Sequence, residues 1–500
     1  MACGWYSHVV ADPNSSTGTW RLSRRETSIL AFAFLIILGF GFNLELRTAL
    51  RRVPMTDLGV YVCGAGAVRD GQDLYQIVDW RKWHYNYPPA LAILMRPLAH
   101  PVPVPPPALP LGTPRTAANT PWGYSIDAPG HYYGLKSDNA RFFWIVAIWY
   151  VISVSLTFLS AHALACALER RRWPEPPPSE KGLRRRWWAL RVIPILICIT
   201  SIGTDFSRGQ VDLVMLAAIS LAVYFASREQ GLTAGIFLSV PACMKVFPAL
   251  ILWYPVWRRH WRMIFGTVVG LVLLLVVLPV VVLGPKRTVE SYQTYATVLL
   301  KPGLGAGQDA SRAKELTNMG ATDNQSLLAT IHRWSYPPGQ RPPKATPAER
   351  LSSYAVGGLM LLGWSFIAGW RRKDSPRQLA LLFGTLMGIT LVLSPVAHNY
   401  YFLLLMPLIT GLVDEALALN RPGARNRTVI ISLSAFMVID MLARLPGIGR
   451  WLRELGLPLL SLVGLICLGG FIVYQYRRTH DNGGQSLLET SGANPITPAA

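Results

Sequence analysis

Charged residues are scarce in this 500-residue chain, in which Asp, Glu, Lys and Arg together make up 15% of the sequence. Soluble domains contain about 25% charged residues. Hydrophobic residues make up 51%, and the mean hydropathy is +0.31. Several apolar runs reach the roughly 17–25 residues that a helix needs to cross a bilayer. The composition therefore excludes an ordinary soluble protein and predicts an all-α protein that crosses the membrane several times.

Cysteine is rare as well, and the six cysteines are scattered with no CxxC spacing. Disulfide frameworks and zinc sites need paired or clustered cysteines, so the sequence indicates neither. A cleavable signal peptide is not indicated, because a polar segment, 1–26, precedes the first apolar run and no small-residue cleavage site follows it. We therefore predict that this run is an uncleaved signal anchor.

Acidic residues are few beside the basic ones, with 27 Asp and Glu against 48 Lys and Arg, and the formal net charge is +21. In a soluble chain this excess would suggest nucleic-acid binding. Here the basic residues form short clusters beside apolar runs, a pattern typical of topology signals and of contact with anionic lipids. We therefore expect anionic membrane lipids, and no nucleic acid, as partners.

The basic clusters predict a topology, because Lys and Arg favour the cytoplasmic side of a membrane. Arg24 and Arg25 precede the first span, and the most basic loop, ERRRWPEPPPSEKGLRRRWW, follows the second. Both terminal segments, 1–26 and 477–500, are then cytoplasmic and enclose a transmembrane domain, 27–476. The ten expected spans are about 27–46, 142–165, 187–203, 212–226, 263–283, 353–370, 378–393, 399–415, 428–445 and 456–475.

The stretch 231–257 does not fit a single straight span. As one helix it would carry the basic sequence WRRHWR to the outer face. Pro241 and Pro248 interrupt it, and Lys245 lies between them at a depth where a lysine needs a partner or water. We therefore predict a broken, re-entrant pair of half-helices with Lys245 at its apex, beside a cavity within the protein.

This topology places five polar segments on the same, outer side. The first outer loop, 47–141, contains Asp57 among several tyrosines and ends in a Pro-rich insertion, 101–140. Separate outer segments that gather on one face predict a site. Its candidate residues are Asp57, Tyr61, Tyr87, Arg208, Gln210, Lys245, Asn324 and Gln325 (both in the second large outer loop, 284–352) and His398.

These residue types suit sugar transfer from a lipid phosphate to a hydroxyl. The reaction needs a general base, which contributes about 10²–10⁴-fold, and Asp57 can supply it. It needs cations or hydrogen-bond donors where charge grows on the departing phosphate, and Lys245, Arg208 and His398 can supply those. Tyrosines such as Tyr61 offer stacking faces to sugars.

Each assignment has a structural alternative. Asp57 could begin a helix, because Thr56–Asp57 precedes an apolar run. Arg208 could form a salt bridge with Asp205 or Asp212, and His398 could be an interface residue. Lys245 is harder to explain structurally, because a lysine cannot easily reach water from the middle of an apolar run.

Four segments of the chain resemble, in the same order, elements of glycosyltransferase family 87 of the GT-C superfamily, whose members are polyprenol-phosphate-dependent mannosyltransferases. The resemblance covers most of 30–415. The segments are DLGVYVCGAGAVRDGQDLY…YNYPPALAILMRPLA, GQVDLVMLAAISLAVYFASREQGLTAGIFLSVPACMKVFPALILWYPVWRRHWR, DNQSLLATIHRW and LVLSPVAHNYYFLLLMPLI.

The resemblance implies a GT-C-like helical bundle with interfacial helices in the first outer loop. It implies an inverting transfer of a sugar, most often mannose, from a polyprenyl-phosphate donor to a glycolipid or glycan acceptor at the outer face of the cell membrane. Asp57 would be the catalytic carboxylate, with no metal or other cofactor. Lys245 and His398 would lie near the donor phosphate, and Gln210, Asn324 and Gln325 would line the cavity.

The sequence also departs from the family pattern and leaves other functions open. Asp212 stands where Asn is common in the family, and the insertion 101–140 is long. The identities of the sugar and of the acceptor therefore cannot be carried over from the family to this chain.

A secondary transporter is an alternative function, because it would share the broken helix, although no second interrupted segment occurs in the other half. An O-antigen ligase or polymerase would use outer-loop arginines such as Arg333. The sequence does not indicate an oligomeric state.

Overall fold

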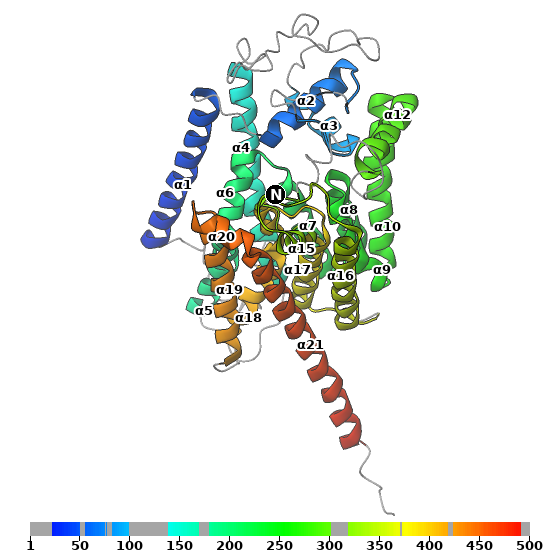
Figure 1. Ribbon diagram of the computed structural model, residues 1–500. Coiled ribbons are helices and arrows are strands. Elements are labelled where there is room, and N and C mark those ends of the chain that lie inside the picture. The colour runs from blue at the N-terminus through cyan, green and yellow to red at the C-terminus, as the bar shows by residue number, and fades with distance from the viewer. Residues whose placement is uncertain are drawn as a thin grey trace, which may run out of the picture. The chain divides into compact units, whose positions relative to one another are not determined.

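The apolar runs of the sequence fold into helices (Figure 1). The computed structural model describes residues 23–50, 56–75, 77, 83–99, 139–169, 180–301, 319–370, 373–418 and 424–491. No β-strand occurs among these residues, and Asn324 and His398 form an isolated antiparallel bridge. Nearly all of the predicted Pro-rich insertion lies outside the described residues.

The chain divides into two units, 1–53 and 54–500. In the first, helix α1 (Arg24–Glu45) continues into the π-helical turn η1 (Leu46–Leu50). Ser23 and Glu26 form a capping box at the start of α1, each side chain accepting from the other residue's backbone N–H. This arrangement satisfies amide groups that a helix start leaves unpaired. The first predicted span therefore begins close to its predicted limit.

The second unit contains the remaining helices. It begins with α2 at Thr56, as the sequence indicated. Its elements are α2 (Thr56–Asp70), α3 (Pro89–Leu94), η2 (Arg96–Leu98), α4 (Asn139–Glu169), α5 (Glu180–Ile197), α6 (Ile199–Arg208), α7 (Asp212–Ser227), α8 (Gly231–Met244), η3 (Phe247–Leu252), α9 (Trp253–Trp257), α10 (Trp261–Val272), η4 (Leu273–Val277), α11 (Leu278–Leu283), α12 (Pro285–Tyr295), η5 (Ala296–Leu300), α15 (Leu327–Ser335), α16 (Pro347–Ala368), α17 (Pro376–Leu393), η6 (Asn399–Leu405), α18 (Met406–Ala416), α19 (Ala424–Leu442), α20 (Ile448–Glu454) and α21 (Leu457–Ser491).

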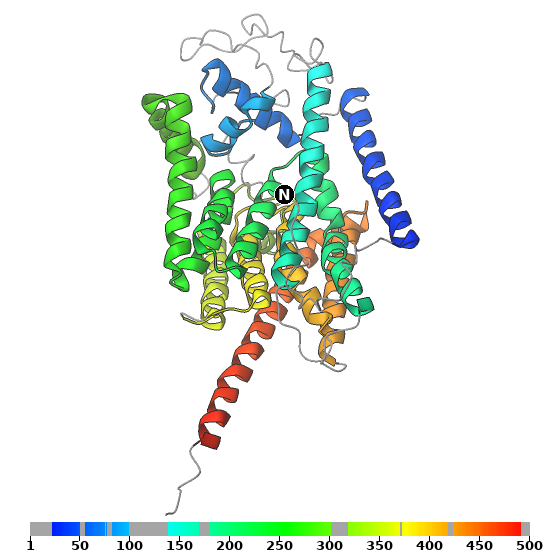
Figure 2. The same ribbon diagram turned by 180° about the vertical axis from the view of Figure 1, so that it is seen from behind.

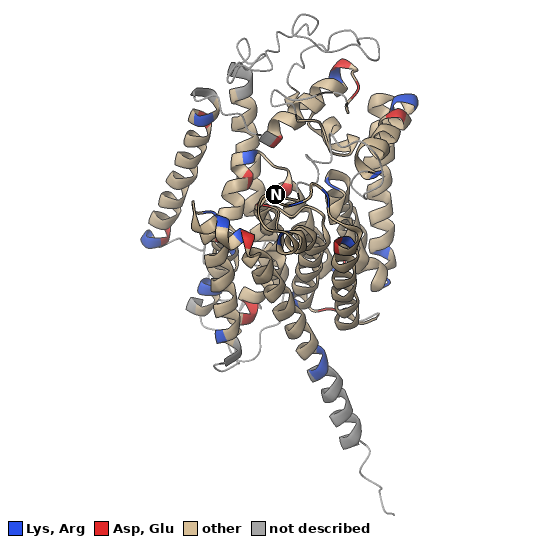
Figure 3. Cartoon of the chain, in the orientation of Figure 1, with Lys and Arg blue, Asp and Glu red and all other residues tan. Residues whose placement is uncertain are grey.

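Six helices in the described part of the chain are long and apolar enough to cross a membrane, and a seventh span is counted if α5 and α6, bent by 59° at their junction, act together. The predicted number of ten full spans is therefore not confirmed, because helices such as α7, which covers the predicted span 212–226, are shorter than a full span. Figure 3 shows long stretches without charged residues in α10–α11, α16 and α21. The predicted loop 284–352 is also not wholly irregular, since it contains α12 and α15.

The chain breaks at Lys245, between α8 and η3. Lys245 is extended, with φ −140° and ψ 145°, and ends α8. Gly231, the first residue of α8, lies beside Arg262 near the start of α10, because a Cβ added to Gly231 would be 3.2 Å from the Cβ of Arg262. The segment between these residues therefore reverses direction near Lys245, and its two ends lie next to each other.

Helices α8 and α10 run in the same direction and pack very closely (Figures 1 and 2). A Cβ added at Gly235 would lie 2.1 Å from the carbonyl oxygen of Met263, and one added at Gly266 would lie 2.1 Å from that of Leu232. Small residues let helix backbones approach in membranes. These two glycines therefore fix the distance between α8 and α10.

We expect Gly235→Ala to destabilise the protein by about 1–3 kcal/mol, the usual cost of overpacking, because the added methyl group meets backbone atoms that cannot rotate away. Thermal unfolding in detergent would measure the change. Gly464→Ala is the matched control, since Gly464 lies in α21 with nothing within 4 Å of its added Cβ. Equal effects of both variants would contradict the proposed close contact.

Candidate functional site

The turn between α6 and α7 carries Arg208 and Gln210 in fixed positions. Gly209 between them ends α6 in the left-handed region, with φ 68° and ψ 43°, and its N–H donates to the carbonyl of Asp205. A residue with a side chain adopts this backbone conformation at a cost, and glycine commonly ends helices in this way. The turn therefore directs the two flanking side chains toward α2 and α8.

Asp57 and Arg208 form an ion pair across 151 positions of sequence. Arg208 Nε donates to Asp57 Oδ2 at 3.0 Å. Asp57 lies in the first turn of α2, where the helix dipole favours a negative charge. The Asp57 side chain is 17% exposed and that of Arg208 is 34% exposed. Both groups are therefore partly accessible, and either could contact a substrate.

Lys245 is almost completely buried and already paired. Its ammonium donates to Asp212 Oδ1 at 2.7 Å and to Gln210 Oε1 at 3.0 Å. The Lys245 side chain is 5% exposed and that of Asp212 is 0% exposed. Asp212 begins α7 and Lys245 ends α8, so each charge also has the favourable sign for its helix end.

Gln210 connects this pair to two tyrosines. Its Oε1 also accepts from the Tyr61 hydroxyl at 2.9 Å, and its Nε2 donates to the Tyr400 hydroxyl at 3.1 Å. Burial raises the pKa of Tyr61 well above its usual value, so Tyr61 stays a neutral hydrogen-bond donor. The network therefore joins α2, the α6–α7 turn, α8 and η6.

Aromatic rings surround the two cations. The Lys245 ammonium lies 4.6 Å from the ring centroid of Tyr401 and 5.9 Å from that of Tyr87, and the Arg208 guanidinium lies 4.9 Å from that of Tyr400. These distances are in the range of cation–π attraction. Tyr87 also meets Tyr61 edge to face at 5.0 Å. The aromatic wall thus combines Tyr61 of α2 and Tyr87 with residues of η6.

His398 lies at the edge of this wall. Its ring stacks on Tyr400 at 5.2 Å, and its Nδ1 is 3.3 Å from the carboxylate of Asp323. The hydrogen bond with His398 lowers the pKa of Asp323 to about 2, so this carboxylate is ionised at neutral pH. Its side chain is half exposed, and an exposed pair contributes little to stability. The pair of His398 and Asp323 therefore forms a polar edge of the candidate site.

Asn324 and Gln325 hold the loop that carries His398. The Asn324 side chain donates to the Pro395 carbonyl at 3.1 Å and accepts from the Ala397 N–H at 3.0 Å. The Gln325 N–H donates to the Ala397 carbonyl at 2.7 Å. Both side chains are buried. The Gln325 side chain donates elsewhere, to the carbonyls of Thr322 and Arg453. The Asn324 side chain and the Gln325 backbone N–H thus hold the 395–397 backbone, which fixes the position of His398.

Most of the predicted residues gather in one network, but two predicted relationships change. Asp212 pairs with Lys245, so the alternative pairing with Arg208 is wrong, and Arg208 pairs with Asp57 instead. Asp205 is fully buried, and neither of its carboxyl oxygens has a hydrogen-bond partner among the described residues. Asn324 and Gln325 meet the network only through the segment that ends at His398. The roles assigned to individual residues stay predictions.

Sequence reasoning gave no role to Asp323, Tyr400 or Tyr401, and it missed a partly buried ion pair between Asp440 and Arg444. Two opposite charges four residues apart near the end of an apolar helix are a visible signal. Tyr400 and Tyr401 were visible beside His398 but carried no periodic pattern that distinguishes a site from a membrane interface.

Comparison with known proteins identifies the class. The chain belongs to glycosyltransferase family 87, whose sequence pattern matches residues 85–395, more than half of the chain. The matched segment contains Arg208 and Lys245 but begins after Asp57 and ends before His398. No curated protein and no solved structure matches the chain. The protein is therefore a membrane glycosyltransferase.

Proposed function

We propose that this glycosyltransferase moves mannose from a polyprenyl-phosphate donor to a lipid- or glycan-linked acceptor, with inversion at the anomeric carbon. The observation that carries the proposal is the ion pair of Asp57 and Arg208, a base and a phosphate-binding cation that are adjacent and partly exposed. Aromatic rings line the same site. Membership of family 87 supports sugar transfer as the reaction.

In the proposed reaction Asp57 takes the proton of the acceptor hydroxyl as its oxygen attacks the anomeric carbon. The bond between that carbon and the phosphate oxygen breaks, and the polyprenyl phosphate leaves with the electron pair and one additional negative charge. Arg208 stabilises this charge, since hydrogen-bond donors aimed at developing charge lower the barrier. We propose no metal or other cofactor.

Lys245 has a different role in this proposal from that of Arg208. Its charge is neutralised by Asp212 and it is buried, so a phosphate would have to displace a carboxylate from a nearly closed position. Lys245 instead fixes Gln210, and through it Tyr61 and Tyr400. The donor phosphate meets Arg208, with His398 at the edge.

We place the site on the outer face of the cell membrane, with both termini cytoplasmic. The positive-inside tendency supports this orientation, because the most basic segment, 169–188, runs from the end of α4 into the start of α5. The reversal of the chain near Lys245 supports the re-entrant arrangement of 231–257. Helices that do not meet the criteria of length and composition for a full span, such as α7 and α19, would complete the ten proposed spans.

An apolar groove supports a lipid-linked substrate. Its volume is about 560 Å³. It lies between α11 and the α3–η2 segment, which begins two residues after Tyr87. An isoprenoid chain would contact the apolar walls of the groove, and Arg96, the one arginine among its lining residues, would attract the phosphate. The lining residues are Ile93, Leu94, Arg96, Pro97, Leu278 and Val282.

The proposal is tested by transfer of radiolabelled sugar from polyprenyl-phosphate mannose in membranes that contain the wild-type chain. Parallel assays use the polyprenyl-phosphate forms of glucose and arabinofuranose. Transfer from the mannose donor supports the proposal in full. Transfer from another donor only would replace mannose, and no transfer from any of the three would overturn the assigned donor class.

We expect Arg208→Lys to raise the KM for the donor about tenfold, because lysine keeps the charge but loses the planar fork that matches phosphate. A tenfold change corresponds to about 1.4 kcal/mol. Steady-state kinetics with varied donor would measure it. Arg69→Lys is the control, since Arg69 forms a comparably exposed pair with Asp70 at 2.7 Å in α2. An unchanged KM in Arg208→Lys would remove Arg208 from the phosphate site.

A further inference from the structure

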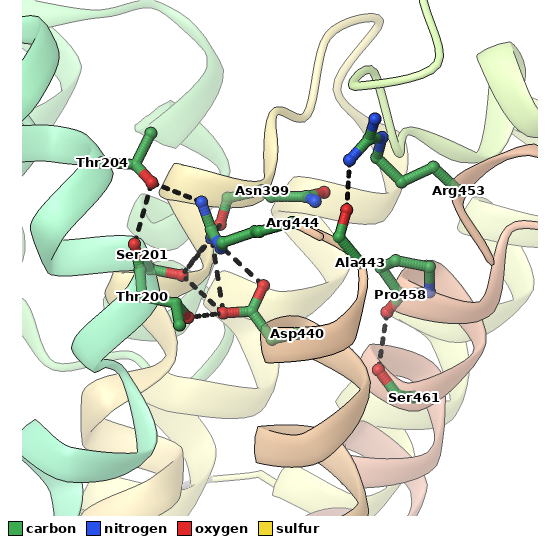
Figure 4. Close-up of polar contacts among 10 residues, drawn as sticks. All are labelled: Thr200, Ser201, Thr204, Asn399, Asp440, Ala443, Arg444, Arg453, Pro458 and Ser461. Carbon is green, nitrogen blue, oxygen red and sulfur yellow. Dashed lines mark hydrogen bonds and ion pairs between the residues drawn. The ribbon is translucent and has the colours of Figure 1, made fainter. Parts of the chain in front are cut away.

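An ion pair that the proposed reaction does not use lies at the end of α19, with its carboxylate buried and its guanidinium partly exposed. Asp440 is 1% exposed, and Arg444 follows one helical turn later, with its guanidinium 3.1 Å from Asp440 Oδ1 (Figure 4). Both residues lie beyond the segment that matches the family. A charge pair in an apolar bundle is costly to bury unless its remaining groups are hydrogen-bonded, and here the partners come from other elements.

The first set of partners lies on α6. Arg444 donates to the hydroxyls of Thr204 and Ser201, the latter at 3.1 Å. Asp440 accepts from the hydroxyls of Thr200 and Ser201, the latter at 3.3 Å. Figure 4 shows these α6 hydroxyls turned toward the end of α19. The pair therefore binds one face of α6.

The second partner is the start of η6. The carbonyl of Asn399 accepts from Ser201 Oγ at 2.9 Å and from Arg444 Nη2 at 3.3 Å. Arg444 thus joins three segments that are far apart in the sequence, namely α6, the start of η6 and the end of α19. A guanidinium can do this because its planar group presents five donors in fixed directions.

The same two elements, α6 and η6, meet again in the candidate site. Ser201, Thr204 and Arg208 are spaced as residues of one helix face, and Arg208 lies 4.9 Å from the ring of Tyr400. Asn399 stands between His398 and Tyr400 in the chain. The contacts of Arg444 therefore fix the position of α6 relative to η6. Because Arg208 is at the end of α6, they also fix the position of its guanidinium.

We infer that Arg444, held by Asp440, is a positioning residue that fixes Arg208 against Tyr400 for binding of the donor phosphate. The inference rests on the proposed function, which assigns Arg208 to that phosphate. Arg444 acts through α6 and η6 and needs no contact with the substrate.

The first test is a double-mutant cycle. Arg444→Lys keeps the charge beside Asp440 but cannot present several donors in one plane. We expect it to raise the KM for polyprenyl-phosphate mannose about fivefold in the wild-type background and less than about twofold in the Arg208→Lys background, because residues that act together are not additive. Additive effects, or an unchanged KM, would overturn the inference.

The matched control is Arg258→Lys. Arg258 is buried and pairs with Asp374 at 2.6 Å, and it also donates to the carbonyls of Ala368 and Gly369. It contacts neither α6 nor η6 through these bonds. We expect this variant to lower thermal stability without raising the KM for the donor. A similar rise in KM would make the Arg444 effect a general result of a weakened fold.

The second test needs no sugar transfer and so separates this inference from the proposed function. Hydrogen–deuterium exchange of the η6 amides should increase in Arg444→Lys and in the milder Ser201→Ala, and should not increase in Arg258→Lys. Faster exchange in these two variants, together with a wild type that transfers no mannose, would keep the link between α19 and η6 while overturning the role in donor binding. Unchanged exchange in both variants would overturn the link itself.

Discussion

Asp57→Asn should lower kcat by about 10²–10⁴-fold, the range that general-base catalysis contributes, and leave the amount of folded protein unchanged. Asparagine has nearly the same shape as aspartate and can still accept from Arg208 Nε through its carbonyl oxygen, so the ion-pair geometry of 3.0 Å need not change. It cannot take a proton from the acceptor hydroxyl. The measurement is kcat with saturating donor in reconstituted membranes.

The same variant gives a second, opposite signature in donor binding. In the wild type an anionic phosphate competes with Asp57 for the Arg208 guanidinium, and Asp57→Asn removes that competition. We therefore expect the KM for the donor to stay the same or fall while kcat collapses. Asp70→Asn is the control on the same helix, because Asp70 pairs with Arg69 rather than with Arg208. A kcat within tenfold of wild type would show that the base is another group.

The second large effect is expected at the buried pair of Lys245 and Asp212. Lys245→Met should destabilise the protein by about 3–5 kcal/mol, because it leaves the Asp212 carboxylate buried without its cation. The double variant Lys245→Met with Asp212→Leu should recover most of this loss, since replacing both charges by apolar groups is often neutral. Thermal unfolding in detergent compares the stability of the wild type, the single variant and the double variant.

Lys373→Met is the control for this series, because Lys373 pairs with Glu229 at 3.8 Å with both side chains almost fully exposed. We expect no measurable change in stability from it, as exposed pairs contribute little. If Lys245→Met were as stable as the wild type, the pair with Asp212 would not be an important contact in the folded protein. In the double variant Gln210 loses the hydrogen bond from Lys245 to its Oε1. The activity of that variant therefore measures how much the position of Gln210 contributes to the reaction.

The sequence predicted local features of the fold well. The start of α2 at Thr56 and the break of the helix at Lys245 follow from capping and proline rules that act within a few residues. The number of full spans did not follow, because helices such as α7, in the predicted span 212–226, are too short to be recognised as spans by length and composition alone. The length of a helix depends on its partners as well as on its own residues.

The pairing of charges could not be predicted from the sequence. A pair between Asp212 and Arg208, four positions away, was one of the structural alternatives, but the partner of Asp212 is Lys245, 33 positions later. Proximity in the chain favours neighbours, whereas the antiparallel packing of α7 on α8 brings the start of one to the end of the other. Asp440 and Arg444 show the reverse case, since their spacing of four was visible and the contacts with α6 and η6 were not.

The place of Lys245 also bears on how the chain enters the bilayer during synthesis. A lone lysine at the tip of an apolar segment would resist partition into lipid. Here α7 and α8 are joined only by the turn at 228–230, so Asp212 and Lys245 reach the membrane on adjacent legs of one helical hairpin. The two charges meet at the open end of that hairpin, opposite the turn, so the pair adds no net charge when the two helices enter the bilayer together.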